Sequence, residues 1–492
     1  MRFEELLQKT ADGKTAPKSD SRLAGPGDTF IALPPATAKK ELPDPSFVRG
    51  ALENGAGFIV YPAAAEDSLA GLFRQFPGSS AIPVDDSAEA LGKLAAAHFG
   101  TEGLPFPVIA VTGTNGKTTT AYILEHLFES CGKKTGVLGT VSYRWPGHSE
   151  AAPLTTPGCL ALHGYLAEMR NAGAEAAIME VSSHALDQNR VAGIRFAAAI
   201  FTNLTQDHLD YHGDMESYFN AKTKLFTQVP DAGKVCAVNC ADPYGKRLAA
   251  ICPSALTFEA GFLPHEKSGS KARLYAQIER CDTSGLTLLH TFDGQTWRMR
   301  SPLVGEHNAF NLLGAEAAAL GLGFSPKDMK GLEGFRGVPG RLERIEAHDA
   351  DTGIFVDYAH TPDALDHALG ALRKAGFGRI IAVFGCGGDR DRTKRPLMGK
   401  AVREGADVAI LTSDNPRTED PEKIMDDVMP GLEGMREVHR EADRRKALAL
   451  AVKLIKPGDA LLVAGKGHEP YQIIGKTKYP FSDQQILKEL LA

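Results

Sequence analysis

One stretch near residue 110 limits more than any other what this chain can fold into. Residues 108–111 form an apolar run that predicts a short buried strand, and the run breaks at Gly113. A Gly-Lys-Thr sequence follows at residues 116–118, and the apolar spacing of residues 119–127 predicts a helix. Glycines let backbone N–H groups surround phosphate oxygens, and the start of a helix adds a positive end. The stretch therefore predicts a phosphate-binding loop.

The loop is shorter than the usual phosphate loop. A glycine normally stands five residues before the Gly-Lys pair, where this chain has Val111, and Gly113 lies closer to the lysine. Lys117 would reach the β- and γ-phosphates of a nucleotide, and Thr118 would offer its hydroxyl to Mg²⁺. A glycine-rich turn with an incidental lysine is the alternative. The flanking strand and helix favour the phosphate loop, because the mechanism requires both.

Length and charge limit the class of protein. At 492 residues the chain is too long for one core, and we expect about three domains. The net charge of −6 argues against a nucleic-acid partner, and no apolar run reaches the ~18 residues of a membrane helix. The seven cysteines are scattered without a Cys-x-x-Cys pair, and the charged N-terminus does not resemble a signal peptide. We expect a cytoplasmic protein.

The chain is predicted to be an α/β protein of three domains. Residues 1–100 predict a small α/β lobe, residues 101–337 a central parallel sheet that carries the phosphate loop, and residues 338–492 a Rossmann-like domain. Apolar runs at 176–181 and 197–201 predict further central strands. A hairpin at 286–300 predicts an antiparallel addition to the central domain.

Polar side chains at the ends of the central strands are candidates for chemistry. Glu180 ends an apolar strand, where a carboxylate is costly unless it is paired or bound to a metal. His208 follows the next strand and could be a metal ligand or a general base, although a structural histidine is equally reasonable. Lys222 and Lys224 lie on a helix predicted to start near residue 215, and spacing alone favours a solvated helix face for both.

The last domain places three polar loops after three predicted strands. Residues 389–395, 414–417 and 465–469 each mix both signs of charge, and ligands of such sheets bind at these strand ends. Solvated loops are the plain alternative. A zwitterionic ligand suits the mixture better, because two of the arginines could hold carboxylates and two acidic residues an ammonium group. The candidates are Arg390, Arg417, Asp414 and Glu469.

Together these motifs resemble the Mur ligase family, the ATP-dependent amide-forming enzymes of peptidoglycan assembly. The resemblance covers nearly the whole chain in order and explains the shortened loop. Its blocks are Gly113 to Thr119, Glu180 to His184, residues 202–212, His307 to Asn311, Gly340-Arg341 and Asp357 to Pro362. Within the family, the member that adds the third peptide residue fits best, and residues 414–417 match its motif for meso-diaminopimelate rather than lysine.

The resemblance implies three sets of binding residues. ATP would be bound by Gly113, Thr114, Asn115, Gly116, Lys117, Thr118, Thr119, Asn308, Arg341 and Asp357. The UDP-muramoyl dipeptide would be bound by Ser19, Ser21, Thr155, Thr156, Ser182, Gln188 and Arg190. Diaminopimelate would be bound by Arg390, Asp414, Asn415, Pro416, Arg417, Gly465 and Glu469.

The resemblance also implies a metal site and a modified lysine. Thr118, Glu180, His208 and Lys222 would hold two Mg²⁺ ions, with Lys222 as a carbamate, N6-carboxylysine. This reverses the solvated interpretation of Lys222. The N-terminal lobe departs from the family, because Pro34-Pro35 and residues 42–45 stand where a glycine and Asp-Gly-His usually follow. From the residues alone, a solvated turn is a better interpretation of Ser21 and Arg22 than a uridine contact.

The implied reaction adds meso-diaminopimelate to UDP-N-acetylmuramoyl-L-alanyl-D-glutamate through an acyl phosphate, in the synthesis of peptidoglycan precursors that cell shape and division require. The expected partners are small molecules, and the expected state is a monomer whose domains close about a hinge near 337–341. Three alternatives stay open: the same ligase using lysine or another diamine, a ligase similar to folylpolyglutamate synthase, and a nucleotide-gated binding module that forms no amide bond.

Overall fold

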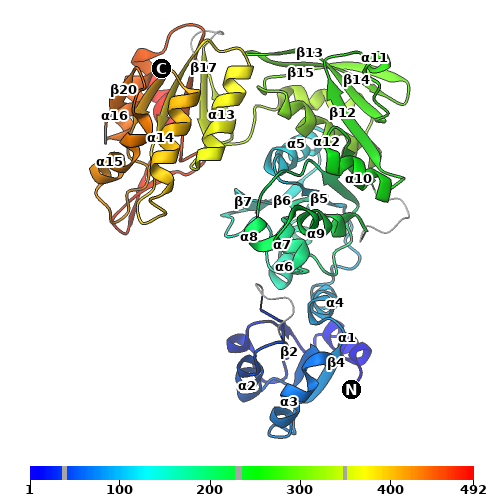
Figure 1. Ribbon diagram of the computed structural model, residues 1–492. Coiled ribbons are helices and arrows are strands. Elements are labelled where there is room, and N and C mark those ends of the chain that lie inside the picture. The colour runs from blue at the N-terminus through cyan, green and yellow to red at the C-terminus, as the bar shows by residue number, and fades with distance from the viewer. Residues whose placement is uncertain (36–41, 228–234, 347–351) are drawn as a thin grey trace. The chain divides into compact units, whose positions relative to one another are not determined.

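The computed structural model describes residues 1–35, 42–227, 235–346 and 352–492. This part of the chain divides into two compact units, Met1–Phe258 with Gly314–Asp328 and Glu259–Leu313 with Met329–Ala492 (Figure 1). Across the described residues we find no helix long and apolar enough to cross a membrane. The predicted α/β class is confirmed, and the division into three domains stays a prediction.

The N-terminal lobe of the first unit is a four-stranded parallel sheet in the order β1-β2-β3-β4. Apolar residues on its two faces form separate cores, one under α2 and α3 and the other under α1 and α4. The 3₁₀ turn Ser21–Leu23 precedes β2. The elements are α1 (Phe3–Ala11), β1 (Pro17–Lys18), β2 (Thr29–Ile31), α2 (Pro45–Glu53), β3 (Phe58–Pro62), α3 (Glu66–Phe73), β4 (Ser80–Val84) and α4 (Ser87–Phe99).

The central sheet of the first unit has the order β12-β11-β10-β5-β9-β6-β7-β8. The strands from β12 to β6 run parallel, and β7 and β8 add an antiparallel edge. Every residue of β5, β9 and β10 is buried, as their apolar runs predict for central strands. Because β5 lies between β9 and β10, the loops after these three strands meet at one edge.

The bounds of β5, β9 and β10 lie within one residue of the apolar runs predicted at 108–111, 176–181 and 197–201. The strands are β5 (Val108–Thr112), β6 (Thr135–Leu138), β7 (Ser142–Trp145), β8 (His148–Ala151), β9 (Ala176–Glu180), β10 (Ala198–Phe201), β11 (Val235–Asn239) and β12 (Leu256–Gly261). The helices are α5 (Lys117–Ser130), α6 (Cys159–Asn171), α7 (Ser183–Asp187), α8 (Leu209–His212), α9 (Met215–Thr227) and α10 (Pro243–Ile251). Helix α11 (His265–Ser268) belongs to the second unit, and α12 (His307–Gly321) begins in the second unit and ends in the first.

The predicted hairpin is present in the second unit. Strands β13 (Leu274–Asp282), β14 (Gly285–Phe292) and β15 (Gln295–Ser301) pair antiparallel. The two-residue turn between β14 and β15 is Asp293-Gly294, and both residues have positive φ, 45° and 77°. An Asp-Gly pair adopts this geometry readily, and the geometry matches the twist of the two strands.

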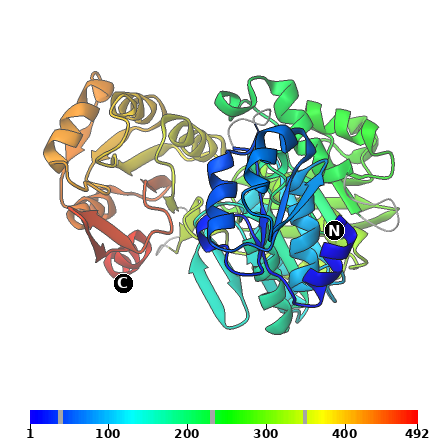
Figure 2. The same cartoon turned by 90° about the horizontal axis from the view of Figure 1, so that it is seen from below.

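The C-terminal part of the second unit is a sheet in the order β16-β17-β21-β18-β19-β20. All its pairs are parallel except β16 with β17. One apolar core lies under α13, α14 and α15, and another lies under α16 and α17, so helices cover both faces (yellow to red in Figures 1 and 2). Strands β21, β18 and β19 are neighbours, which brings the three predicted polar loops to one edge.

The predicted alternation of strands and helices in this part is confirmed. The strands are β16 (Glu343–Ile345), β17 (Gly353–Asp357), β18 (Arg379–Phe384), β19 (Val408–Leu411), β20 (Val438–Arg440), β21 (Asp459–Ala464), β22 (Tyr471–Ile474) and β23 (Thr477–Pro480). The helices are α13 (Pro362–Lys374), α14 (Lys394–Gly405), α15 (Pro421–Leu432), α16 (Arg444–Leu454) and α17 (Asp483–Leu491).

Candidate active site

The phosphate loop leaves the end of β5 and enters α5. Gly113 has a φ of 148°, and a Cβ added there would lie 1.9 Å from the hydroxyl oxygen of Thr202. Gly116 caps α5 with a φ of 84°. These two positions accept only glycine, because one lacks space for a Cβ and both have positive φ. The free N–H groups of the first turn of α5 then face the loop, as an anion site requires.

The end of β10 fixes the shape of this loop. Asn203 accepts a hydrogen bond from the backbone N–H of Asn115 at 3.0 Å and donates one to the Asn115 carbonyl at 3.1 Å. The hydroxyl of Thr202 donates to the same carbonyl at 2.6 Å, and the N–H of Thr114 donates to the Asn203 carbonyl at 2.9 Å. The Thr-Asn pair after β10 is therefore a template for the loop after β5.

Two lysines converge on the carbonyl oxygen of Gly113. Lys117 donates to it at 3.0 Å and to the Thr114 carbonyl at 2.9 Å, and Lys222 donates to it at 2.8 Å. Only 2% of Lys222 is exposed, so the interpretation of this lysine as a solvated helix residue is wrong. Lys224, two residues on, is 41% exposed at its side chain and does fit that interpretation. Helix α9 buries one face, and Lys222 lies on that face.

Burial lowers the pKa of Lys222 well below its usual value, and the positive charge of Lys117 lowers it further. The carboxylate of Asp207 acts in the opposite direction with a smaller effect. A lysine with a lowered pKa holds a larger fraction of neutral amine near neutral pH. The neutral amine is the form that attacks an electrophile such as CO₂.

Glu180 and Thr118 form the oxygen-rich part of this site. The Thr118 hydroxyl donates to the buried Glu180 carboxylate at 2.9 Å. Thr140 supplies two further donors to that carboxylate, its N–H at 2.8 Å and its hydroxyl at 3.0 Å. A carboxylate and a hydroxyl in contact at the start of a phosphate loop fit Mg²⁺, which prefers one or two protein carboxylates together with phosphate oxygens.

His208 lies in a different environment. Its φ is 53°, and its ring nitrogen lies 3.4 Å from the Asp207 carboxylate. The ring also packs edge-on against His184, with 4.8 Å between ring centroids, and 46% of the side chain is exposed. Among the described residues, no three or more His, Cys, Asp or Glu side chains form a cluster that could hold a metal. The role of His208 as a metal ligand stays a prediction.

Seven residues are predicted to bind the dipeptide, and four of them, Thr156, Ser182, Gln188 and Arg190, form one hydrogen-bonded group. The Thr156 hydroxyl accepts from the N–H of Ser182 at 3.0 Å and donates to its hydroxyl at 3.4 Å. Arg190 donates to the Gln188 side chain at 2.6 Å and to the Thr156 carbonyl at 3.2 Å. The hydroxyl of Thr155 lies 3.2 Å from that of Thr140, so Thr155 adjoins the Glu180 carboxylate.

A cavity of about 370 Å³ in the N-terminal lobe is lined by Ser19 and Ser21, which were predicted to bind the UDP-muramoyl dipeptide. Ser21 is 9% exposed, so the interpretation of this serine as part of a solvated turn is wrong, whereas Arg22 is exposed and pairs with Asp20 at 2.7 Å. The exposed ring of Phe47 contributes an apolar wall. The remaining lining residues are Phe30, Ala32, Leu33, Pro43 and Asp44.

The second unit gathers the residues predicted to bind the amino acid. Lys466, which is wholly buried, donates to the Asn415 side chain at 3.0 Å, and its nitrogen lies 3.3 Å from the Asp414 carboxylate. Asn415 in turn donates to the Glu469 carboxylate at 2.9 Å. Burial lowers the pKa of Lys466, although the Asp414 carboxylate opposes that effect. Lys466 thus joins the loop after β19 to the loop after β21.

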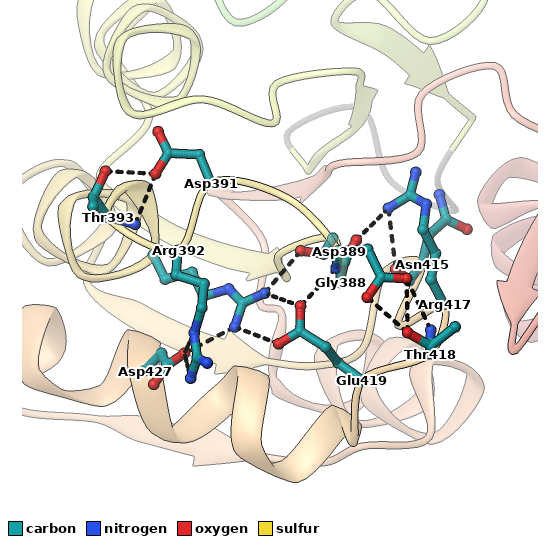
Figure 3. Close-up of polar contacts among 12 residues, drawn as sticks. Gly388, Asp389, Asp391, Arg392, Thr393, Asn415, Arg417, Thr418, Glu419 and Asp427 are labelled. Atoms are coloured by element: carbon teal, nitrogen blue, oxygen red, sulfur yellow. Dashed lines mark hydrogen bonds and ion pairs between the residues drawn. The ribbon is translucent and has the colours of Figure 1, made fainter.

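Two arginines approach one glycine in the neighbouring loop after β18. A Cβ added to Gly387 would lie 3.0 Å from the Arg417 guanidinium and 3.7 Å from Cγ of Arg390. Arg417 donates to the Gly388 carbonyl at 2.8 Å, as Figure 3 shows. Two guanidinium-bearing side chains over a glycine form a surface that suits carboxylates.

The remaining residues predicted to bind ATP lie in the second unit. The buried carboxylate of Asp357 accepts from the N–H groups of Leu342 at 2.6 Å and Ala359 at 2.7 Å. Burial raises the pKa of Asp357 despite these donors. Arg341 lies over the Tyr358 ring at 5.3 Å, and the Asn308 side chain donates to the Val304 carbonyl at 2.8 Å. These residues thus have local structural partners, and their contact with ATP stays a prediction.

Comparison with known proteins decides the family. Residues 111–319 match the Mur ligase middle domain, and residues 340–467 match the Mur ligase glutamate ligase domain. The chain is 51% identical over 474 residues to the UDP-N-acetylmuramoyl-L-alanyl-D-glutamate--2,6-diaminopimelate ligase of Lawsonia intracellularis, which covers 96% of this chain and 95% of that protein. This chain belongs to the Mur ligase family.

Comparison with other Mur ligases supports the same family assignment. The protein of the same name from Synechococcus elongatus is 44% identical over 97% of this chain and 94% of its own length. A solved structure of a UDP-N-acetylmuramoyl-L-alanyl-D-glutamate--2,6-diaminopimelate ligase is 33% identical, covers 97% of this chain and 94% of that chain, and has a TM-score of 0.70. Mycobacterium tuberculosis folylpolyglutamate synthase, 19% identical over 75% of this chain and 90% of that chain with a TM-score of 0.56, shares the fold alone.

The Mur ligase motifs named most of the residues described above and missed some of the residues that contact them. Thr140, Asn203 and Lys466 were not assigned, although each contacts a predicted residue directly. A lysine between two glycines after a buried strand was a usable signal for Lys466. Nothing in the sequence around Thr140 indicates that its N–H faces Glu180, because β6 and β9 are 37 residues apart in the chain and meet only in the sheet.

Proposed function

We propose that this Mur ligase joins meso-2,6-diaminopimelate to UDP-N-acetylmuramoyl-L-alanyl-D-glutamate with cleavage of ATP to ADP and phosphate. The observation that carries the proposal is the approach of Arg390 and Arg417 to Gly387, at the sheet edge where the loops with Asp414 and Glu469 also lie. Diaminopimelate has a carboxylate where lysine has only hydrogen, and a guanidinium can bind that carboxylate with two hydrogen bonds. The names of the relatives agree with this substrate.

The proposed reaction has two steps. An oxygen of the D-glutamyl carboxylate attacks the γ-phosphorus of ATP, and ADP leaves. The amine nitrogen of diaminopimelate then attacks the acyl carbon, inorganic phosphate leaves and the nitrogen loses a proton. Lys117 and the N–H groups at the start of α5 would stabilise the negative charge on the transferring phosphoryl group. Bound Mg²⁺ would neutralise phosphate charge in the same step.

Lys222 is proposed to act as a carbamate. Its amine is buried beside Gly113, and its pKa is lowered by burial, so the neutral form needed for reaction with CO₂ is available. The nitrogen of the neutral amine bonds to the carbon of CO₂ and loses one proton, which converts the amine into an anionic oxygen ligand. Two Mg²⁺ ions are proposed, held by Thr118, Glu180, His208 and this carbamate. A monomer in the cytoplasm is proposed as the working state.

Product analysis tests the proposal. Purified protein with ATP, Mg²⁺, UDP-muramoyl dipeptide and meso-diaminopimelate should yield the UDP-muramoyl tripeptide, ADP and phosphate in equal amounts. Mass spectrometry of the nucleotide product and a phosphate assay measure all three. ATP cleavage without a tripeptide would contradict the ligase proposal and would favour the binding-module alternative. A tripeptide only with glutamate as amine donor would favour the folylpolyglutamate-like alternative.

A further inference from the structure

The loop after β18 carries Arg390, and the loop after β19 carries Arg417. A hydrogen bond between their backbones joins the two loops. The N–H of Gly388, after β18, donates to the Asn415 carbonyl, after β19, at 2.9 Å. A Cβ added to Gly388 would lie 1.9 Å from the Pro416 carbonyl oxygen, so only glycine permits this approach. Arg417 returns the contact by donating to the Gly388 carbonyl at 2.8 Å (Figure 3).

The side chain of Asp389 also joins the two loops. Its carboxylate accepts from the Thr418 hydroxyl at 2.8 and 3.0 Å and from the Thr418 N–H at 3.2 Å. Its own N–H donates to the Glu419 carboxylate at 2.6 Å. Figure 3 shows Asp389 between Arg417 and the Thr418–Glu419 segment. Thr418 directly follows Arg417, so Asp389 fixes the backbone next to that arginine.

Both loops are also strained at these positions. Asp389 has a φ of 54° and Arg417 a φ of 50°. A residue other than glycine is destabilised in this left-handed region, and such strain persists only where surrounding contacts hold it. Asp389 tolerates the region because a short polar side chain can form local hydrogen bonds. Arg417 lacks that capacity, so its conformation depends on neighbours such as the Gly388 carbonyl and the Asp389–Thr418 contact.

We propose that Asp389 is a positioning residue for amino-acid selection. By holding Thr418, it keeps the Arg417 guanidinium over Gly387, where the neighbouring Arg390 also reaches. The Arg417 guanidinium is then held where it could bind the carboxylate at the far end of a diamino acid. This inference rests on the proposed function, since it assigns Asp389 to the discrimination between diaminopimelate and lysine.

Kinetics of variants at one contact test the inference. Asp389→Ala removes the acceptor, and Thr418→Val removes the donor while keeping the size of the side chain. Each should raise KM for diaminopimelate about ten- to hundredfold, because a hydrogen bond to a charged group is lost. KM for ATP should not change in either variant, and the preference for diaminopimelate over lysine should fall. The double variant should be no worse than either single one, because both changes remove the same contact.

Two further variants separate positioning from a general structural effect. Asp389→Asn keeps an acceptor for Thr418 and tolerates a positive φ, so it should restore most of the preference for diaminopimelate. Asp391→Ala is the matched control, because Asp391 lies in the same loop and its carboxylate bonds Thr393 at 2.6 Å instead. It should behave as wild type.

Three results would overturn the inference. They are unchanged discrimination in Asp389→Ala, equal increases in KM for ATP and diaminopimelate, and an effect in Asp391→Ala as large as that in Asp389→Ala. Wild-type turnover in the same assay keeps the two claims distinguishable. No turnover of diaminopimelate by wild type would overturn the proposed function together with this inference, whereas normal wild-type turnover with unchanged discrimination in Asp389→Ala would overturn the inference alone.

Discussion

The side-chain nitrogen of Lys222 donates a 2.8 Å hydrogen bond to the carbonyl oxygen of Gly113, although the two residues are 109 positions apart. A buried lysine is thereby held against the backbone of the phosphate loop. This location explains why its environment is so different from that of Lys224 on the same helix, and it connects α9 to the chemistry of the loop.

Lys222→Ala is expected to lower the rate of ligation by roughly 100-fold, the upper range for loss of a group that supports a metal site. ATP should still bind, because the phosphate-loop backbone is intact. Measurement of kcat and of the dissociation constant of ATP checks both parts, with Lys224→Ala as the matched control. Removal of dissolved CO₂ should reduce wild-type activity, and bicarbonate should restore it. Unchanged activity without CO₂ would contradict the carbamate proposal.

Gly113→Ala is expected to weaken ATP binding roughly 10- to 100-fold. The added Cβ would lie 1.9 Å from the Thr202 hydroxyl oxygen, and overpacking of this kind costs about 1–3 kcal/mol. Titration with a fluorescent ATP analogue measures the change. Gly370→Ala, in α13, is the control, since a Cβ there meets nothing within 4 Å. Equal ATP affinity in wild type and Gly113→Ala would show that the loop adapts to the added methyl group.

Lys466→Met is expected to raise KM for diaminopimelate and to lower the melting temperature. The change leaves the Asp414 carboxylate buried without its partner, and removal of one member of a buried ion pair costs about 3–5 kcal/mol. Steady-state kinetics and thermal unfolding measure the two effects. Lys476→Met, at the exposed turn after β22, should change neither. A normal KM for diaminopimelate in Lys466→Met would separate this lysine from the amino-acid site.

The Arg395–Glu419 contact predicts a dependence of stability on pH. Hydrogen bonds from the buried Arg395 side chain, and then from the N–H of Asp389, lower the pKa of Glu419 from 4.5 to about 2. Because the folded pKa lies below the unfolded one, this stabilisation is complete above pH 4.5 and is lost as the pH falls toward 2. The difference in melting temperature between wild type and Glu419→Gln should therefore shrink over that window. A constant difference from pH 6 to pH 3 would refute the assignment.

Much of the fold could be predicted because its central strands are continuous apolar runs. Strands β5, β9 and β10 are buried on both faces, and each corresponds to such a run. Strand β23 was not predicted, because all its residues are exposed and it has no apolar pattern to detect. The three polar loops were correctly predicted to lie close together, because the carboxyl ends of parallel strands meet at one edge of a sheet.

Contacts within the site were harder to predict than its residues. The spacing of residues in the sequence could not predict that Lys222 is buried, because its burial depends on how α9 packs in the first unit. The group around Lys466 joins a loop after β19 to one after β21, and the sequence does not reveal this contact because Asn415 and Lys466 are 51 positions apart. The contact between Asp389 and Thr418 is similar, because it forms only when β18 and β19 pair.

The central claim is that Arg417 selects diaminopimelate, and the ratio of kcat/KM for meso-diaminopimelate to kcat/KM for lysine tests it most directly. In wild type the ratio should exceed about 100, because two charge-assisted hydrogen bonds to the second carboxylate together contribute about 3 kcal/mol or more. In Arg417→Met, which keeps a long side chain without the guanidinium, the ratio should approach one. A wild-type ratio near one, or an unchanged ratio in Arg417→Met, would contradict the account.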